Sequence, residues 1–303
     1  MDLLIGFTTI LVVIAAGAAL AHVGVLDRRS QRTLGEIAFF VASPALMVVT
    51  ISRVELGAAA ANLVASSVSL AACFAAYVVV ARLRWRLDTG ALLIGALSSS
   101  YVNAGNLGIA IAAYVVGDLT VVVPTLLVQM LVVQPAALVV LDRVTGRGEG
   151  VRSAARRLVT NPLTLAAVVG LVLATTGWRL PAPLLSPLEM LAGAAIPLML
   201  MSYGAALRLS PPIGRAGHNG EVVVATVLKM GVMPVVAWAV GVGLGLEGQV
   251  LLGVVITAAL PTAQNIFLHA TRYRVGEDVA RETILVTTLA SLPAALLVAV
   301  LLG

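Results

Sequence analysis

The chain has 303 residues, of which 60% are hydrophobic and 11% are charged. A water-soluble domain of this length carries charge on about 25% of its residues. Most of the surface of this protein is therefore too apolar to be in contact with water. The single cysteine, Cys73, excludes an internal disulfide and a metal site built from several cysteines. The balance of 19 basic against 14 acidic residues could suggest nucleic acid, but the distribution of the arginines argues against such a partner.

A helix that crosses a membrane needs about 20 mostly apolar residues, and ten segments meet that requirement. In chain order they are Leu3–Val25, Leu34–Ile51, Leu63–Ala81, Ala91–Val116, Leu119–Leu141, Pro162–Trp178, Leu188–Leu207, Val222–Leu246, Val250–Ala270 and Thr283–Leu302. The first segment has no basic start and too long an apolar run for a cleaved signal peptide. The sequence therefore predicts an all-α polytopic membrane protein with ten transmembrane helices.

The arginines test this count, because cytoplasmic loops of membrane proteins are enriched in basic residues. Sixteen of them fall on one side of the predicted membrane, namely Arg28, Arg29, Arg32, Arg82, Arg84, Arg86, Arg143, Arg147, Arg152, Arg156, Arg157, Arg208, Arg215, Arg272, Arg274 and Arg281. Arg53 and Arg179 fall on the other side, and Lys229 lies inside a span. This asymmetry predicts that both termini lie outside the cytoplasm.

The longest polar connection, Asp142–Thr160, divides the ten spans into five and five. Because five is odd, a second copy of the first half must insert upside down, which gives the inverted repeat common in secondary transporters. We therefore predict one membrane domain made of two five-helix repeats, residues 1–155 and 156–303. Each repeat carries a proline in its second span, within Ser43–Val49 and Ile196–Ser202.

The fourth span of each half is interrupted by polar residues, in Tyr101–Ile111 (YVNAGNLGIAI) and Ala259–Ala270 (ALPTAQNIFLHA). Asn and Gly are poor helix formers and Pro removes a backbone donor, so both helices should break. If the broken helices cross, two amino ends with their free N–H groups, near Leu107 and Thr262, could hold an anion. The alternative is that the amide side chains only hold helices together.

The candidate substrate-binding residues are Asn103, Gly105, Asn106, Leu107, Gly108, Pro261, Thr262, Gln264 and Asn265, with Ser43, Ser202, Gln129 and Lys229 added from other spans. Lys229 follows Glu221 by about 12 Å of helix at ~1.5 Å per residue, nearly halfway through a ~30 Å apolar core. Its ammonium could attract an anion or replace a cation, or it could extend to the cytoplasmic surface.

These features resemble the auxin efflux carrier family, which includes bacterial malonate and malate permeases. The resemblance covers the whole chain and includes the central basic loop and the NAGNLGI and LPTAQN segments. It implies an inverted repeat with broken, crossed fourth and ninth helices, in the bacterial cytoplasmic (inner) membrane. It also implies elevator-type transport of a small organic anion, a carboxylate that is auxin- or dicarboxylate-like. The family often has a proline shortly after the GN..G pattern, where this chain has Ile109, Ala110 and Ile111.

A sodium-coupled bile acid-type organic anion symporter of the same architecture is the alternative function. Coupling to H+ or Na+ and assembly as a homodimer stay open at this stage. Metal-dependent and nucleophilic enzymes of the membrane use DxxD, HExxH or GxSxG motifs, and ATP-driven pumps use GxxxxGK[ST]. The chain contains none of these motifs. We therefore predict a transporter with no catalytic residues, no cofactor and no metal site.

Overall fold

The computed structural model describes residues 2–53, 56–146, 160–209 and 217–303. Within these ranges the regular structure is helical, apart from one isolated antiparallel bridge between Val102 and Thr262. The chain forms two compact units, and each unit takes helices from both halves of the sequence. Unit 1 comprises Met1–Gly57, Gly105–Val123 and Val159–Pro211, and unit 2 comprises Ala58–Ala104, Pro124–Leu158 and Pro212–Gly303.

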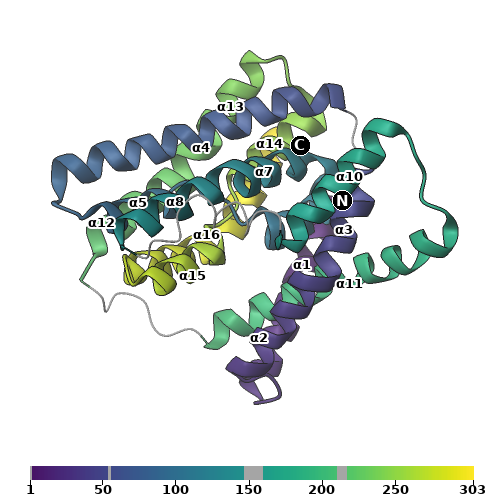
Figure 1. Ribbon diagram of the computed structural model, residues 1–303, viewed down its shortest axis with the longest axis horizontal. Coiled ribbons are helices and arrows are strands. Elements are labelled where there is room, and N and C mark those ends of the chain that lie inside the picture. Colours follow the sequence, from purple (N-terminus) through teal and green to yellow (C-terminus); the bar gives the residue numbers. More distant parts are fainter. Residues whose placement is uncertain (1, 54–55, 147–159, 210–216) are drawn as a thin grey trace. The chain divides into compact units, whose positions relative to one another are not determined.

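Unit 1 is organised around two apolar helices that pack closely, α1 (Asp2–His22) and α11 (Ala182–Leu209) (Figure 1). A Cβ atom on Gly204 would lie 1.9 Å from the carbonyl oxygen of Ile14, so this crossing requires a glycine. The other elements of this unit are α2 (Arg28–Ile37), η1 (Ala38–Ala42), α3 (Ser43–Ile51), η2 (Ala104–Gly108), α6 (Ile109–Ile111), η3 (Ala112–Val116), η4 (Leu119–Val122) and α10 (Pro162–Thr176).

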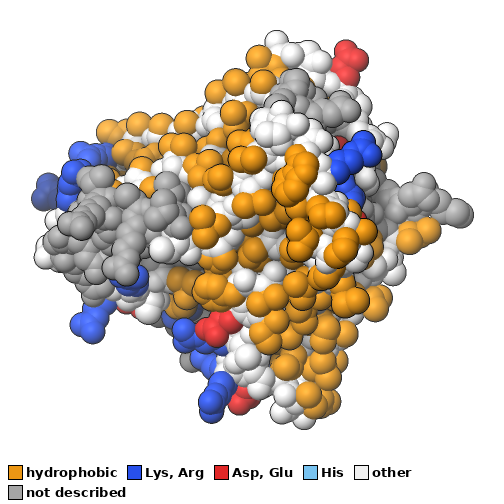
Figure 2. All heavy atoms as spheres, turned by 45° about the vertical axis from the view of Figure 1, so that its right-hand side comes forward, with side chains coloured by type: hydrophobic (Ala, Val, Ile, Leu, Met, Phe, Trp, Pro, Cys, Tyr) orange, Lys and Arg blue, Asp and Glu red, His pale blue; other side chains and the backbone are white. Residues whose placement is uncertain are grey.

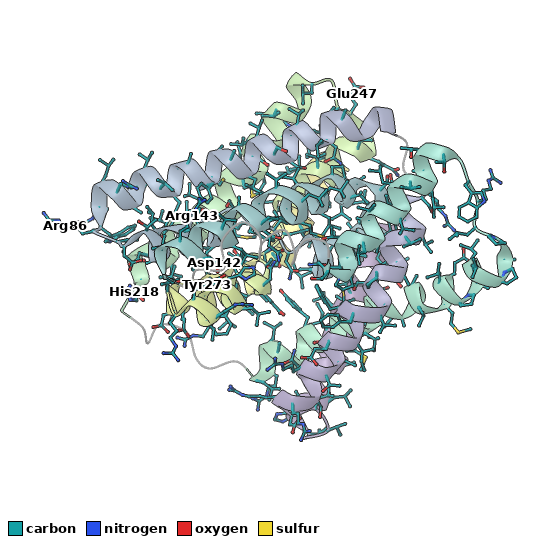
Figure 3. All side chains as sticks on the ribbon, in the orientation of Figure 1. Arg86, Asp142, Arg143, His218, Glu247 and Tyr273 are labelled. Atoms are coloured by element: carbon teal, nitrogen blue, oxygen red, sulfur yellow. The ribbon has the colours of Figure 1, made fainter. Side chains whose placement is uncertain are left out.

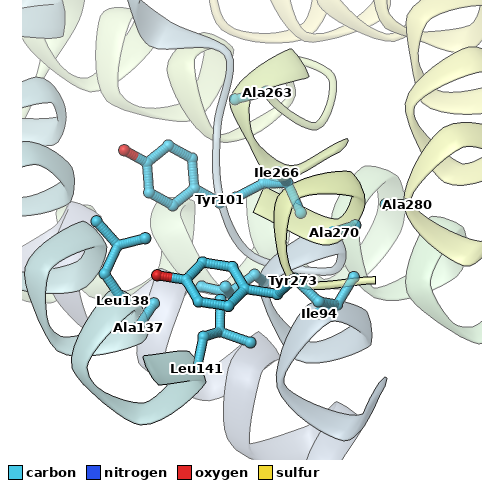
Figure 4. Close-up of a cluster of buried hydrophobic side chains, with 11 residues drawn as sticks. Ile94, Tyr101, Ala137, Leu138, Leu141, Ala263, Ile266, Ala270, Tyr273 and Ala280 are labelled. Carbon is cyan, nitrogen blue, oxygen red and sulfur yellow. The ribbon is translucent and has the colours of Figure 1, made fainter. Parts of the chain in front are cut away.

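Unit 2 contains both segments that end at the predicted interruptions, α5 (Thr89–Ser98) and α14 (Gly248–Ala258). Its other elements are α4 (Leu56–Arg84), α7 (Val123–Val128), η5 (Gln129–Val133), α8 (Gln134–Val144), α12 (Asn219–Val227), η6 (Leu228–Val232), α13 (Met233–Gly243), α15 (Gln264–Tyr273) and α16 (Glu277–Leu302). A cluster of buried apolar side chains joins α5, α8 and α15, including Ile94, Leu141 and Ile266 (Figure 4).

The sequence explains where several helices begin. Asp27, Asp88 and Asn161 each accept a hydrogen bond from a backbone N–H in the first turn of the helix that follows, at 2.7, 2.9 and 2.9 Å. Short polar side chains at this position stabilise helices because the first N–H groups have no partner within the helix. Gly177 ends α10 in the left-handed conformation that glycine adopts without strain.

Three wider, π-helical turns precede prolines. The turns η1, η5 and η6 are each followed by an α-helix with proline at its second position, namely Pro44, Pro135 and Pro234. Proline has no N–H and its ring clashes with the carbonyl of the preceding turn, so a wider turn accommodates it. These three wide turns therefore accompany prolines that are visible in the sequence.

Six of the described helices are long and apolar enough to cross a membrane. They are Arg28–Ile51, Ala60–Arg84, Leu119–Val144, Ala182–Leu209, Asn219–Gly243 and Glu277–Leu302. Shorter apolar helices occupy Thr8–His22, Thr89–Ser98, Pro162–Thr176 and Gly248–Ala258. On the face that Figure 2 shows, hydrophobic side chains cover broad continuous areas, whereas Lys and Arg side chains gather in a few places. An integral membrane protein is confirmed, while the ten-span inverted arrangement stays a prediction.

Candidate functional site

Both interrupted segments unwind, and in unit 2 their extended parts pair. One extended part, Tyr101–Asn103, follows α5, and the other, Pro261–Ala263, precedes α15. The N–H of Asn103 donates to the carbonyl oxygen of Pro261 at 2.8 Å, and the N–H of Ala263 donates to that of Tyr101 at 3.1 Å. These bonds frame the antiparallel bridge between Val102 and Thr262. We call this short pairing the crossing.

Side chains from two other helices hold the crossing in place. The amide of Gln129, on η5, accepts from the N–H of Val102 at 2.5 Å and donates to its carbonyl oxygen at 3.0 Å. The hydroxyl of Thr287, on α16, accepts from the N–H of Thr262 at 3.1 Å. The hydroxyl of Thr262 in turn donates to the carbonyl oxygen of Ser98, the last residue of α5, at 2.5 Å. Buried backbone groups need such partners where no helix supplies them.

Two amide atoms beside the crossing have no hydrogen-bond partner in the described structure, Asn103 Nδ2 and Asn265 Oδ1. Asn103 is 3% exposed, so water at the surface does not satisfy it. Asn265 lies near the hydroxyl of Tyr101, which donates to Gln134 Oε1 at 3.2 Å. A buried polar group without a partner is destabilising by about 1–3 kcal/mol. A ligand that supplied the missing hydrogen bonds would therefore be stabilised here.

The amino end of α15 also offers unpartnered hydrogen-bond donors. Ala263 precedes this helix and supplies no side-chain cap. Among the described residues, nothing accepts from the first two N–H groups of the helix, on Gln264 and Asn265. Free N–H groups at a helix amino end carry partial positive charge and bind anions. The N–H of Thr262 was expected to face an anion, but it is occupied by Thr287. The free donors lie two and three residues further along.

Lys229 lies inside η6 and is fully buried, at 0% exposure. One interpretation of the sequence had this ammonium extend to the cytoplasmic surface. The burial of Lys229 contradicts that interpretation. Nζ donates to the carbonyl oxygen of Ala258 at 2.7 Å and contacts Met233 Sδ at 3.3 Å. Ala258 is the last residue of α14, so the ammonium caps the carboxyl end of the interrupted helix.

The remaining candidates belong to unit 1 and are described apart from the crossing. Ser43 donates to the carbonyl oxygen of Ala38 at 2.7 Å, which places its hydroxyl within η1 and α3. Ser202 bonds the side chain and the carbonyl oxygen of Gln31. Of the fourth-span residues, those from Gly105 to Gly108 fall in η2 of unit 1, with Leu107 buried there. Their predicted role, that of Asn106 included, stays a prediction.

Sequence analysis did not single out Tyr101 or Thr287, which support the crossing. It also did not single out Asp142, whose carboxylate is buried where α8 ends. Tyr273, at the end of α15, donates its hydroxyl to Asp142 Oδ1 at 2.5 Å (Figure 3). A signal existed for this pair, because each residue lies near the start of a predicted basic loop. Pattern reading does not reveal which two loops meet in space.

The chemistry of the crossing is that of amides, hydroxyls, helix ends and one ammonium. Across the described parts of the chain, no three His, Cys, Asp or Glu side chains lie close enough to hold a metal ion together. Such an arrangement can bind and release a charged solute without forming or breaking a covalent bond. Apolar helices and a discontinuous helix pair with polar groups at the break are features of membrane transport proteins.

Comparison with known proteins identifies the family. The model of the family described as membrane transport protein, the auxin efflux carrier family, matches residues 4–299. The chain belongs to this family. The predicted resemblance is thereby confirmed, and a transporter is indicated rather than an enzyme.

Curated relatives match about half of the chain. A "Probable auxin efflux carrier component 1c" from Oryza sativa subsp. japonica is 29% identical over 152 residues, which is 49% of this chain and 26% of that protein. A "Putative malonate transporter" from Rhizobium meliloti (strain 1021) is 33% identical over 138 residues, 45% of this chain and 42% of that protein. Auxin efflux carrier component 4 from Arabidopsis thaliana is 28% identical over 152 residues, 49% of this chain and 24% of that protein. The matches thus span less than half of each relative.

Proposed function

We propose that this chain carries small organic anions across the bacterial cytoplasmic membrane and binds their carboxylate at the crossing in unit 2. The observation that carries the proposal is the unpartnered amide donor of Asn103, Nδ2, together with the uncapped amino end of α15. Asn265 Oδ1 is unpartnered too, but it is an acceptor, and only the turned amide presents a donor to a carboxylate. The names of two relatives, an auxin carrier and a malonate transporter, both refer to carboxylates and so support this class of substrate.

The chemistry favours a carboxylate over a neutral solute. A carboxylate has two oxygens and accepts several hydrogen bonds, and hydrogen bonds to a charged group are the stronger ones. Asn103 Nδ2 and the N–H groups of Gln264 and Asn265 are unpaired donors within a few residues of the crossing. The amide of Asn265 can rotate to present its nitrogen instead of its oxygen. A carboxylate at this place would complete the hydrogen bonding of the broken helices.

We propose an elevator-type mechanism in which unit 2 carries the substrate and unit 1 supports it. A carrier of this kind needs its binding groups within one rigid body, so that the site travels with the substrate. Asn103, Asn265 and Lys229 all belong to unit 2. Each unit also takes helices from both halves of the chain, so the moving bodies in this proposal are the compact units and not the sequence repeats.

Substitution of the two asparagines tests the site. Losing one hydrogen bond to a charged group costs about 1.5–3 kcal/mol, roughly a tenfold to hundredfold loss of affinity. Asn103→Ala and Asn265→Ala should each weaken binding of malonate by that factor and slow its uptake into liposomes. Asn219→Ala makes the same chemical change at an exposed position and should leave both measurements unchanged.

Two results would contradict this proposal in different ways. Normal malonate binding and uptake by both folded asparagine variants would remove the crossing from the substrate site. Failure of the folded wild-type protein to bind or move malonate or any other small carboxylate would remove the substrate class. Thermal unfolding in detergent, compared with the wild type, shows whether each variant is folded.

A further inference from the structure

We propose that Lys229 is the charge-selecting residue of the transport site and that its ammonium offsets one carboxylate of the substrate in place of a co-transported sodium ion. This inference rests on the proposed function and names the residue that selects charge. Lys229 is fully buried, inside a helix that is apolar enough to cross the membrane, Asn219–Gly243.

The surroundings of Lys229 leave its charge without an opposite full charge. Its described contacts are a backbone carbonyl at 2.7 Å and a thioether sulfur at 3.3 Å. The thiol of Cys73, on α4, donates to the carbonyl oxygen of Leu228, the residue before Lys229, at 3.4 Å. Glu221, on the same helix, pairs with His218 at 3.0 Å. An ammonium without a counter-charge is costly at membrane depth, and such residues mark substrate or ion pathways.

The ammonium is held close to the crossing. Ala258 and Pro261 are three residues apart, and three extended residues span at most about 11 Å. The carbonyl oxygen of Pro261 accepts from Asn103, and Nζ lies 2.7 Å from the carbonyl oxygen of Ala258. The charge therefore lies within about 14 Å of the crossing backbone. A unit charge at ~14 Å, with an effective dielectric constant of about 20, changes the affinity for an anion by roughly tenfold.

The two interrupted helices differ at their carboxyl ends, and the difference points to a specific role. At the end of α5 the carbonyl oxygen of Ser98 accepts from the neutral hydroxyl of Thr262. At the end of α14 the carbonyl oxygen of Ala258 accepts from an ammonium. A hydroxyl suffices as the donor at the end of α5. The hydrogen bond to Ala258 therefore does not by itself explain why a lysine stands at position 229. The carboxyl end of a helix attracts a cation, and Lys229 supplies one from within the protein.

Substitutions that separate charge from hydrogen bonding test the proposal. Lys229→Gln keeps a donor for Ala258 and removes the charge, whereas Lys229→Arg keeps the charge. Binding of malonate is measured on purified protein in sodium chloride and again in choline chloride. The wild type should bind equally in both salts, within about twofold. Lys229→Gln should bind at least roughly tenfold more weakly, and Lys229→Arg should stay within severalfold of the wild type.

The possible outcomes separate this proposal from the one on which it rests. Unchanged malonate binding by folded Lys229→Gln overturns the role of Lys229 and leaves the crossing site intact. Binding of malonate by the wild type in sodium chloride but not in choline chloride also overturns the role of Lys229. This outcome needs only the wild-type protein, so it holds even if neither Lys229 variant folds. A folded wild type that binds no carboxylate in either salt contradicts the proposed function, and the role of Lys229 falls with it.

Discussion

At the scale of single residues, the side-chain amide of Gln129 supplies the hydrogen bonds that a neighbouring backbone would give to Val102. Val102 has left helical geometry, so its N–H and carbonyl have no partners within a helix. Both groups bond the same side-chain amide, at 2.5 and 3.0 Å, and Gln129 is 1% exposed. One side chain thus replaces two backbone hydrogen bonds at a depth where water cannot. The geometry of the crossing depends on this contact.

Gln129→Met should therefore destabilise the protein although it keeps the size of the side chain. The variant leaves a buried N–H and a buried carbonyl without partners, each costing about 1–3 kcal/mol. We expect a lower melting temperature in detergent and weaker malonate binding, measured by thermal unfolding with and without the ligand. Val132→Ala, three residues along and 62% exposed, is the matched control. Equal melting temperatures of Gln129→Met and the wild type would contradict the role assigned to this amide.

The sequence predicted where polar residues gather but not which of them are free. Asn103 and Asn265 were candidates for the site, and both retain unpartnered atoms. Gln129 and Thr262 were candidates too, yet their polar groups are occupied by backbone or by another side chain. The partner of a side chain depends on helices that are distant in the chain. Composition and spacing hold no information on that choice.

At the scale of helices, prolines and glycines made the interruptions predictable. Helices stop at Ser98 and Ala258 and resume at Ala104 and Gln264, as the polar segments indicated. The π-helical turns were not predicted, although three of them, η1, η5 and η6, each precede a proline that is visible in the sequence. A proline predicts a local disturbance, but whether the helix kinks, ends or widens depends on the packing around it.

Close packing of α1 on α11 gives a prediction for unit 1. A Cβ atom on Gly204 would meet backbone atoms of α1, which cannot move aside as a flexible side chain can. Gly204→Ala should therefore lower the free energy of unfolding by about 1–3 kcal/mol or more through overpacking. Gly193, on the same helix, has nothing within 4 Å of its Cβ position. Gly193→Ala should be neutral or stabilising, because alanine favours helix by up to ~1 kcal/mol. Similar melting temperatures for the two variants would contradict the close approach.

At the scale of the whole molecule, two divisions of the chain have different meanings. The predicted repeats, residues 1–155 and 156–303, divide the sequence at its centre. The compact units divide it in space, and each unit combines segments from before and after the central loop. Sequence patterns along the chain suggest duplication, whereas compactness depends on contacts between distant segments. For this reason the sequence offers a prediction of the repeats, which stays a prediction, and none of the units.

The asymmetry of the arginines predicts how the molecule lies in the membrane. Sixteen basic residues on one predicted side against two on the other place the first side in the cytoplasm. The loop around Trp178, which is 61% exposed, should then face outwards, and the exposed Ser30 should face the cytoplasm. In a Cys73→Ala background, Trp178→Cys should react with a membrane-impermeant thiol reagent in intact cells. Ser30→Cys should react only after permeabilisation, and the background without an added cysteine should not react. The reverse pattern would invert the predicted topology. Labelling of both positions in intact cells would place them on the same side of the membrane, which contradicts the five predicted spans between them.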